Sequence, residues 1–421
     1  MQYLRCLFGI AFFIGLAWAI SWDRRRFQWR VVLGGIALQF ALVLLVAKTD
    51  AGRAFFEGAA RFIVKLVSKT VPGAQAVFGH LATDSGADFI FAFAGTGLLV
   101  IIFVSALMSI LYHVGVMQVL VWAIAKVMSS TMGLSGGESM AAAANIFMGQ
   151  TEAPLVIRPY LLRMTRSELN SLMTGGFATI AGSVMAIYLK ILGPELAPHL
   201  IAASVMSAPA SFVISKIILP ERDAPETARG VELKVERNAV NIIEAAANGT
   251  SDGLKLWLNV VAMLIAFIAL VALVDWPLGA LGEWLGSLGL LEGPLSLGRI
   301  FGWIFAPFAW AIGVEGWHDC QMVGSLLGTQ VSVNEFVGYS QLGQILQSTD
   351  PAQRFEHSRS AILASYALCG FANFASIGVQ IGGISALAPE RKGDVAKLAF
   401  RAMLGGAFAC WMTATIAGAL L

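Results

Sequence analysis

The chain has 421 residues, of which 57% are hydrophobic and only 13% are charged. Ordinary soluble domains carry roughly 25% charged residues, so this composition predicts an all-α polytopic membrane protein. The formal net charge of +2 is too small to indicate a nucleic-acid-binding protein, and the four cysteines lie too far apart for a zinc knuckle or a CxxC redox motif.

The first apolar stretch, from Leu4 to Trp22, has some features of a signal peptide. A signal peptide carries its positive charge before the apolar run. Here only Arg5 lies at that end, whereas the basic residues Arg24, Arg25, Arg26 and Arg30 follow the run. The positive-inside rule therefore predicts a retained first span with an outer N-terminus.

Further apolar stretches of about 20 residues, the length that crosses a bilayer, follow along the chain. They lie near 31–47, 90–112, 170–190, 196–216, 255–275, 360–382 and 396–420. With the first stretch they predict about eight crossings. The basic residues on the predicted inner side are Arg158, Arg163, Arg166, Lys216, Arg222, Arg229, Lys234, Arg237, Arg391, Lys392, Lys397 and Arg401. The stretch from Trp276 to Leu297 has no Lys or Arg, which predicts an outer loop.

One basic segment lies on a predicted outer connection, against the positive-inside rule. Its charged residues recur about every four positions opposite an apolar face. The charged set is Arg53, Glu57, Arg61, Lys65 and Lys69, and the apolar set is Phe55, Phe62, Ile63 and Leu66. This pattern predicts an amphipathic helix that lies in the membrane interface.

Two regions, 116–166 and 299–350, are too interrupted by glycine and polar residues to span a membrane. Re-entrant helix–turn–helix hairpins fit both, the first entering from inside and the second from outside. The first contains GQTEAPLVIRPYL, and the second contains NEFVGY. Each run places a carboxylate, Glu152 or Glu335, at hydrocarbon depth, where an unpaired polar group costs several kcal/mol. Such groups predict a ligand site.

The chain also contains a weak repeat. TGGFATIAGSV follows Glu152, and CGFANFASIGV follows Glu335, so each acid precedes a helix with a Gly-Phe-Ala motif. With opposite entry sides this is an inverted repeat, the architecture in which secondary transporters hold substrate near the bilayer midplane on broken helices. The alternative is that Gly-Phe-Ala reflects ordinary packing of small residues between helices.

The polar residues of these motifs favour a neutral ligand. Carboxylates and amides without a matching Lys or Arg suit a molecule rich in hydroxyl or N–H donors, because an ionised carboxylate only accepts hydrogen bonds. Phe371 and Phe374 offer aromatic faces on which a planar base could stack. A polyol joined to a flat heterocycle describes a nucleoside.

Four blocks, GQTEAPLVIRPYL, MTGGFATIAG, NEFVGY and ALCGFANFASIGVQIGG, closely resemble the signature blocks of the concentrative nucleoside transporters. The resemblance covers roughly Val100 to the C-terminus. It implies a homotrimer whose inner scaffold stays fixed while an outer transport domain moves across the membrane like an elevator. The expected division is scaffold and interfacial helix at 1–115, first transport repeat at 116–216, cytoplasmic loop and scaffold helix at 217–298, and second transport repeat at 299–421.

The resemblance also implies roles for individual residues. Gln150, Thr151 and Glu152 would face the base, with Val184 beside it and Gly149, which precedes Gln150, influencing base preference. Glu335, Asn373 and Ser376 would hold the ribose hydroxyls, and Phe371 would line the pocket. The sodium site would comprise Asn145, Met148, Thr179 and Ile180, with Met148 and Ile180 contributing backbone carbonyl groups. Backbone oxygens freed at a hairpin tip and a helix break are suitable ligands for a hard cation.

Structural alternatives exist for these residues. Asn145 could hydrogen-bond to a neighbouring helix, Thr179 could bond back to its own helix, and Phe371 could be plain packing. Glu152 could form an ion pair with Arg158 or Arg163.

The sequence therefore predicts a secondary active importer of nucleosides of the uridine, cytidine and adenosine class, coupled to sodium and without a catalytic cofactor. We expect it in the bacterial inner membrane, with both termini periplasmic. A proton-coupled symporter with Glu152 as proton carrier is the first alternative. An intramembrane hydrolase using His318, Asp319 and Glu335 is the second, although no HExxH or GxSxG motif accompanies these residues. A place at the outer end of the second hairpin is the alternative for His318 and Asp319.

Overall fold

The computed structural model describes residues 2–79, 99–193, 195–228, 239–288 and 293–420. Within these ranges every regular element is a helix. The start of the predicted span 90–112 and the basic residues Arg229, Lys234 and Arg237 lie outside the described residues.

Helices α1 (Gln2–Ala19) and α2 (Trp29–Lys48) form at the first two predicted spans. The predicted amphipathic segment forms α3 (Asp50–Ser68), and α4 (Val71–Phe78) follows it. α3 packs on α2 and on α13 (Ala197–Ile218), and its Phe56 and Ala60 are buried, whereas Phe55 and Phe62 stay exposed on this chain.

The first interrupted region contains one more helix than the predicted hairpin needs. α6 (Val100–Val114) meets α7 (Val116–Met132) at a bend of 78°. Gly115 lies at this bend with φ of +96°, a conformation that glycine adopts without strain. The hairpin follows as α8 (Gly136–Asn145), a tip at 146–152, α9 (Ala153–Val156) and α10 (Arg158–Leu161). We call residues 136–161 hairpin 1.

A broken helix follows hairpin 1. The predicted span 170–190 consists of α11 (Arg166–Ala178) and α12 (Gly182–Leu192), separated by extended backbone at 179–181. α13 (Ala197–Ile218) then runs through the centre of the molecule, almost fully buried.

The longest helix is α14 (Ile242–Ser287), with 46 residues. At about 1.5 Å per residue it is about 69 Å long, more than twice the thickness of a hydrocarbon core. The prediction of an outer loop from Trp276 is wrong for residues 276–287, which are helical. The absence of Lys and Arg reports on membrane sidedness and not on backbone conformation, and the apolar helical pattern continues past Pro277.

The second interrupted region has the same plan as the first. α15 (Leu297–Ile312) meets α16 (Trp317–Ser332) at a bend of 109°, and a tip at 333–334 leads into α17 (Glu335–Gln347). We call residues 317–347 hairpin 2. The predicted span 360–382 is again broken, into α18 (Ser358–Ala367) and α19 (Phe374–Leu387). α20 (Lys392–Leu420) closes the chain.

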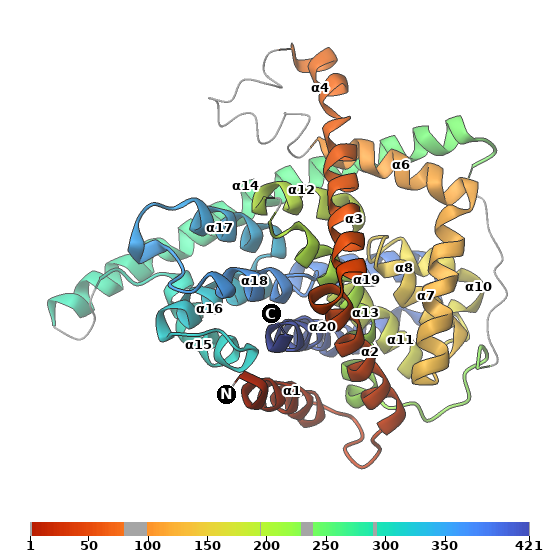
Figure 1. The fold of residues 1–421 in the computed structure, drawn as a ribbon, viewed down its shortest axis with the longest axis horizontal. Coiled ribbons are helices and arrows are strands. Elements are labelled where there is room, and N and C mark those ends of the chain that lie inside the picture. Colours follow the sequence, from red (N-terminus) through yellow and green to blue (C-terminus); the bar gives the residue numbers. More distant parts are fainter. Residues whose placement is uncertain (1, 80–98, 194, 229–238, 289–292, 421) are drawn as a thin grey trace.

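Both halves pack on a common core of α13 and α20. In Figure 1 α20 lies in the middle, with α7, α8 and α10 on one side and α15, α16 and α17 on the other. Small residues let the helices approach closely, since a Cβ added at Gly406 would lie 2.4 Å from the Cβ of Phe177. Each repeat therefore consists of a hairpin, a broken helix and a long central helix, which is α13 in the first repeat and α20 in the second.

Among the described residues, five helices are long and apolar enough to cross a membrane, and up to seven if each bent pair counts as one span. α1 is apolar but falls short by length.

Candidate functional site

A cleft of about 690 Å³ lies where the N-terminal residues of α9, α12, α17 and α19 come together. All nine residues predicted to contact substrate line it: Gly149, Gln150, Thr151, Glu152, Val184, Glu335, Phe371, Asn373 and Ser376. Helix N-termini carry free N–H groups and partial positive charge, which suits a site that contains two acids. Phe374, the second predicted stacking residue, packs instead against Phe400, with ring centroids 6.3 Å apart.

Glu335 is held from two directions. Its carboxylate accepts a hydrogen bond from the Tyr188 hydroxyl at 3.1 Å and another from Asn373 Nδ2 at 2.9 Å. Asn373 Oδ1 in turn accepts from the backbone N–H of Ser376 at 2.8 Å and so caps α19. No ion pair found in the described part of the chain includes Glu335. The carboxylate is fixed by neutral donors, with lone pairs left for a ligand.

Tyr188 is a site residue that the sequence analysis missed. Its ring stacks on Tyr339 with centroids 4.2 Å apart, and the Tyr339 hydroxyl donates to the carbonyl of Ser365 at 2.8 Å. Tyr188 follows Val184 by one helical turn, so helical spacing alone would have placed both on one face of α12.

The base-side residues come from the tip of hairpin 1. Glu152 is the N-cap residue of α9, and its carboxylate accepts the Gly149 N–H at 3.3 Å. The alternative pairing with Arg163 is not realised, since Arg163 binds Glu226 at 2.5 Å. Gln150 Oε1 accepts from Gln380 Nε2 at 3.0 Å, and Gln380 is the second residue that the sequence analysis missed.

The predicted sodium ligands lie where hairpin 1 meets the break in α11 and α12. The backbone N–H of Gly182 donates to the carbonyl of Phe147 at 3.0 Å and so joins the two segments. Met148 belongs to the same tip, and Ile180 to the same break.

Asn145 is 1% exposed, and neither Oδ1 nor Nδ2 of its side chain has a hydrogen-bond partner among the described residues. A buried unpaired amide is costly, and such groups in proteins commonly bind a ligand, an ion or water. The alternative of a hydrogen bond to a neighbouring helix is therefore not realised.

Thr179 does bond back to its helix, donating to the Gly175 carbonyl at 2.9 Å. A hydroxyl that donates its proton keeps lone pairs that can accept a cation. Oxygen atoms of an amide, a hydroxyl and backbone carbonyls form a donor set that a hard cation such as sodium prefers.

The other wall of the cleft comes from α14, through Asp252, Lys255 and Asn259. A neighbouring chamber of about 360 Å³ shares Glu152, Ser183 and Asp252 with the cleft and extends between α6 and α14. These two helices pack closely: the Cα of Ile102 lies so near Gly253 that a Cβ added there would be only 2.7 Å away. The ligand space therefore lies between the hairpin tips and a separate pair of helices.

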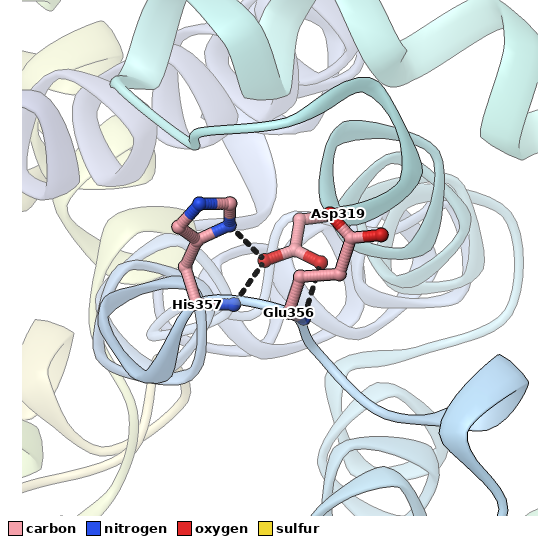
Figure 2. Close-up of side chains that lie close together, drawn as sticks. All are labelled: Asp319, Glu356 and His357. Carbon is pink, nitrogen blue, oxygen red and sulfur yellow. Dashed lines mark hydrogen bonds and ion pairs between the residues drawn. The ribbon is translucent and has the colours of Figure 1, made fainter.

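His318 and Asp319 do not form a dyad, since His318 Nε2 lies 3.3 Å from the carbonyl oxygen of Arg354. Figure 2 shows Asp319 beside Glu356 and His357 instead. Asp319 is fully buried and accepts the N–H groups of Glu356 at 2.8 Å and His357 at 3.1 Å, and the Ser360 hydroxyl at 2.6 Å. The ligand atoms of Asp319, Glu356 and His357 lie within 4.8 Å of one another, but the donors already present occupy Asp319. Asp319 thus ties the residues that lead into α18, and Ser360 in its first turn, to hairpin 2.

Three family models match the chain. Residues 8–81 match the "Na+ dependent nucleoside transporter N-terminus", residues 96–195 match "Nucleoside recognition", and residues 199–418 match the "Na+ dependent nucleoside transporter C-terminus".

Similar curated proteins include an uncharacterized transporter of Haemophilus influenzae, 41% identical over 99% of this chain and 98% of its own length. Sodium/nucleoside cotransporter 1 of Rattus norvegicus is 40% identical over 98% of this chain, and Solute carrier family 28 member 3 of Homo sapiens is 41% identical over 100%. The chain spans 63% and 60% of the length of these two mammalian proteins.

Among solved structures, CNTnw in an inward-facing substrate-bound state is 40% identical, with a TM-score of 0.91, covering 100% of this chain and 98% of the other. A doubly substituted CNTnw in an outward-facing state is 39% identical, also with a TM-score of 0.91, over 100% and 98% of the two chains.

Proposed function

The chain belongs to the family of concentrative, Na⁺-dependent nucleoside transporters, and we propose that it takes up nucleosides by sodium symport. It is a transporter and not an enzyme, which removes the hydrolase alternative. The observation that carries the proposal is the meeting of the predicted nucleoside residues in one cleft, together with the buried Asn145, whose side chain has no hydrogen-bond partner in the described part of the chain.

At the sugar end, Glu335 accepts the ribose hydroxyls, and Asn373 and Ser376 complete the contact. The fixed carboxylate supports this role, since Tyr188 and Asn373 orient it before substrate arrives. Charge-assisted hydrogen bonds of this type contribute about 1.5–3 kcal/mol each. Phe371 lines the same part of the cleft and offers a ring to the nucleoside.

At the base end, Gln150, Thr151 and Glu152 recognise the polar edge of the base, with Gly149 and Val184 beside it. Substrates of the uridine, cytidine and adenosine class fit a site that offers amide and carboxylate groups and in which the lining Lys255 is already paired with Asp252 at 3.5 Å. Residue 149 is glycine, which has the smallest side chain, and this favours a broad range of bases.

The coupling ion is sodium, held by Asn145, Thr179 and the carbonyl groups of Met148 and Ile180. The ion fixes the tip of hairpin 1 and with it Gln150 and Glu152 in the geometry that binds the base. One cation that crosses 100 mV supplies about 2.3 kcal/mol, and a tenfold ion gradient supplies about 1.4 kcal/mol more. Together they sustain accumulation of roughly several hundredfold.

Substrate crosses by an elevator movement within a homotrimer. The transport domain comprises residues 116–216 and 299–421, and the scaffold comprises residues 1–115 and 217–298. The position of the cleft between the hairpin tips and α14 supports this division. The homotrimer is what the family resemblance implies, and exposed apolar side chains along α14, among them Leu258, Ile268, Leu273 and Trp276, offer a surface that lipid or a partner subunit would cover.

The protein resides in the bacterial inner membrane with both termini periplasmic. Two contacts support placing both termini on one side. Arg5 donates to the Trp310 carbonyl at 3.0 Å beside the α15–α16 turn, and Arg359, at the start of α18, donates to the Gly418 carbonyl. The segments that carry the basic residues assigned to the cytoplasmic side also contact one another. Arg222 pairs with Asp23 and Arg166 with Asp394, and Arg391 donates to the carbonyl of Leu162.

The test is uptake of labelled uridine by proteoliposomes, with an inward gradient of sodium or of choline. We expect unmodified uridine to accumulate only with the sodium gradient. Cytidine and adenosine should compete, and the free bases should compete less well. Uptake that ignores sodium and accelerates on external acidification would replace sodium by a proton and leave the nucleoside site intact.

A further inference from the structure

Gln380 joins the two repeats at the base end of the cleft. It lies on α19, is 1% exposed, and its amide nitrogen donates to Gln150 Oε1 at 3.0 Å and to the Met173 carbonyl at 3.0 Å. These contacts connect the second broken helix with the tip of hairpin 1 and with α11.

The backbone contact fixes which way the Gln380 amide points. A carbonyl oxygen only accepts hydrogen bonds, so the amide NH₂ of Gln380 must face Met173, and its two hydrogens serve Met173 and Gln150. The atom of Gln150 that receives the second hydrogen must then be its oxygen. Gln150 lines the cleft, and its NH₂ group donates no hydrogen bond to any residue described here.

Glycines make room for this arrangement. A Cβ added at Gly176 would lie 2.6 Å from Gln380 Nε2 and 3.0 Å from the Cβ of Gln150. A Cβ added at Gly383 would lie 3.0 Å from Thr151 Cγ2. Two glycines from different halves of the chain thus allow α11 and α19 to close on the tip of hairpin 1.

We propose that Gln380 is a positioning residue that turns Gln150 so that it offers N–H donors, and no acceptor, to the base. This inference rests on the proposed nucleoside function. Glu152 accepts hydrogen bonds, so the pair presents one donor beside one acceptor. The matching ligand edge is an imide, with a carbonyl oxygen facing Gln150 and a ring N–H facing Glu152, as in uracil.

The experiment measures the affinities of uridine and cytidine for the purified, full-length protein at saturating sodium. Gln380→Glu replaces the NH₂ by a carboxylate oxygen, which accepts from Gln150 and turns the Gln150 oxygen toward the cleft. The ratio of uridine to cytidine affinity should then shift about tenfold toward cytidine, whose amino group donates. Gln380→Met only releases Gln150 and should shift the ratio about threefold in the same direction.

Gln330 provides the matched control. It is also a fully buried glutamine, and its Nε2 donates to the carbonyl groups of Leu368 and Gly370, each at 3.1 Å, but it does not contact Gln150. Gln330→Met should lower the melting temperature and leave the ratio within twofold of wild type. A purely structural role for Gln380 predicts the same behaviour for both glutamines.

A wild-type measurement covers the case in which the variants do not fold. The pyrimidin-2-one ribonucleoside lacks both the C4 carbonyl and the N3–H of uridine, and so the whole imide edge, and it should bind about tenfold more weakly than uridine. Equal binding of these two nucleosides, or folded Gln380 variants with an unchanged ratio, would overturn the inference. Failure of wild-type protein to bind uridine at all would instead reject the proposed function.

Discussion

Hairpin 1 and hairpin 2 turn at the same cleft, but residues 146–152 separate the helices of the first and only residues 333–334 separate those of the second. Asn334 caps α17 by accepting the Val337 N–H at 2.9 Å, whereas the amide of Asn145 has no partner among the described residues. Glu335 is held by two side chains, whereas Glu152 is held by one backbone contact at 3.3 Å.

The difference indicates how binding and coupling are divided between the repeats. Protein groups alone complete hairpin 2, so the ribose end is pre-organised and loses little entropy on binding. Hairpin 1 has polar atoms that the described protein groups leave unpaired and that an ion and a base can bind. The dependence of substrate affinity on sodium should therefore reside in hairpin 1.

The largest effect should come from Glu335→Gln. An amide replaces only part of the charge-assisted bonding to ribose, so uridine affinity should fall by roughly ten- to a hundredfold or more, measured by equilibrium binding. Thermal unfolding should change much less, because Gln has the same size. Wild-type affinity in a well-folded Glu335→Gln protein would remove Glu335 from the sugar site.

Asn145→Ala should weaken sodium binding. Removing one oxygen ligand should raise the sodium concentration for half-maximal uptake roughly tenfold, with a smaller loss of uptake at saturating sodium. Because the Asn145 side chain makes no hydrogen bond to any residue that the structure describes, stability should change little.

The matched control is Asn170→Ala, which removes a buried amide that donates to the Ser215 carbonyl at 3.1 Å. It should lower the melting temperature without changing the sodium dependence. If both variants shifted the sodium dependence equally, Asn145 would have no special role.

Tyr188→Phe should have a moderate effect on hairpin 2. It removes one of the two donors that orient Glu335 while Asn373 stays in place, so uridine affinity should fall about five- to tenfold. The half-saturating sodium concentration should stay within about twofold, since the ion is assigned to hairpin 1. A sodium shift as large as that of Asn145→Ala would show that the two tips are not independent.

The smallest effect should come from pH. The Arg222 guanidinium beside Asp23 holds the pKa of that carboxyl below its usual range. A lowered pKa means that the Asp23 contribution to stability is present above the unfolded value of about 4 and is lost only as pH falls through the folded value. This contact between the α1–α2 loop and the segment after α13 should therefore persist between about pH 5.5 and 8.

Sodium-driven uptake should accordingly stay within about twofold over that range. A steep rise of sodium-free uptake on acidification would mean that a proton completes hairpin 1.

The sequence predicted both hairpins and both acids because polar residues in an apolar chain stand out without any knowledge of the fold. It also predicted the two broken helices, through the repeated Gly-Phe-Ala blocks. Tyr188 and Gln380 were missed because each acts on a partner far along the chain, 147 residues away for Glu335 and 230 for Gln150. Only the packed inverted repeats bring these pairs together.

The extent of α14 was missed for a different reason. Hydropathy reports the length that a membrane requires, and a helix can continue well beyond it. α7 and α15 were also misjudged: they are separate helices that precede the hairpins, but the predicted interrupted regions 116–166 and 299–350 included them.

The contrast between the tips is tested most directly by hydrogen–deuterium exchange of the purified protein, with and without sodium and in the absence of nucleoside. Sodium should slow exchange of the backbone amides at 146–152 severalfold and leave those at 333–339 unchanged. An exchange rate at 146–152 that does not change with sodium, or equal protection of both tips by sodium, would contradict the assignment of the ion to hairpin 1.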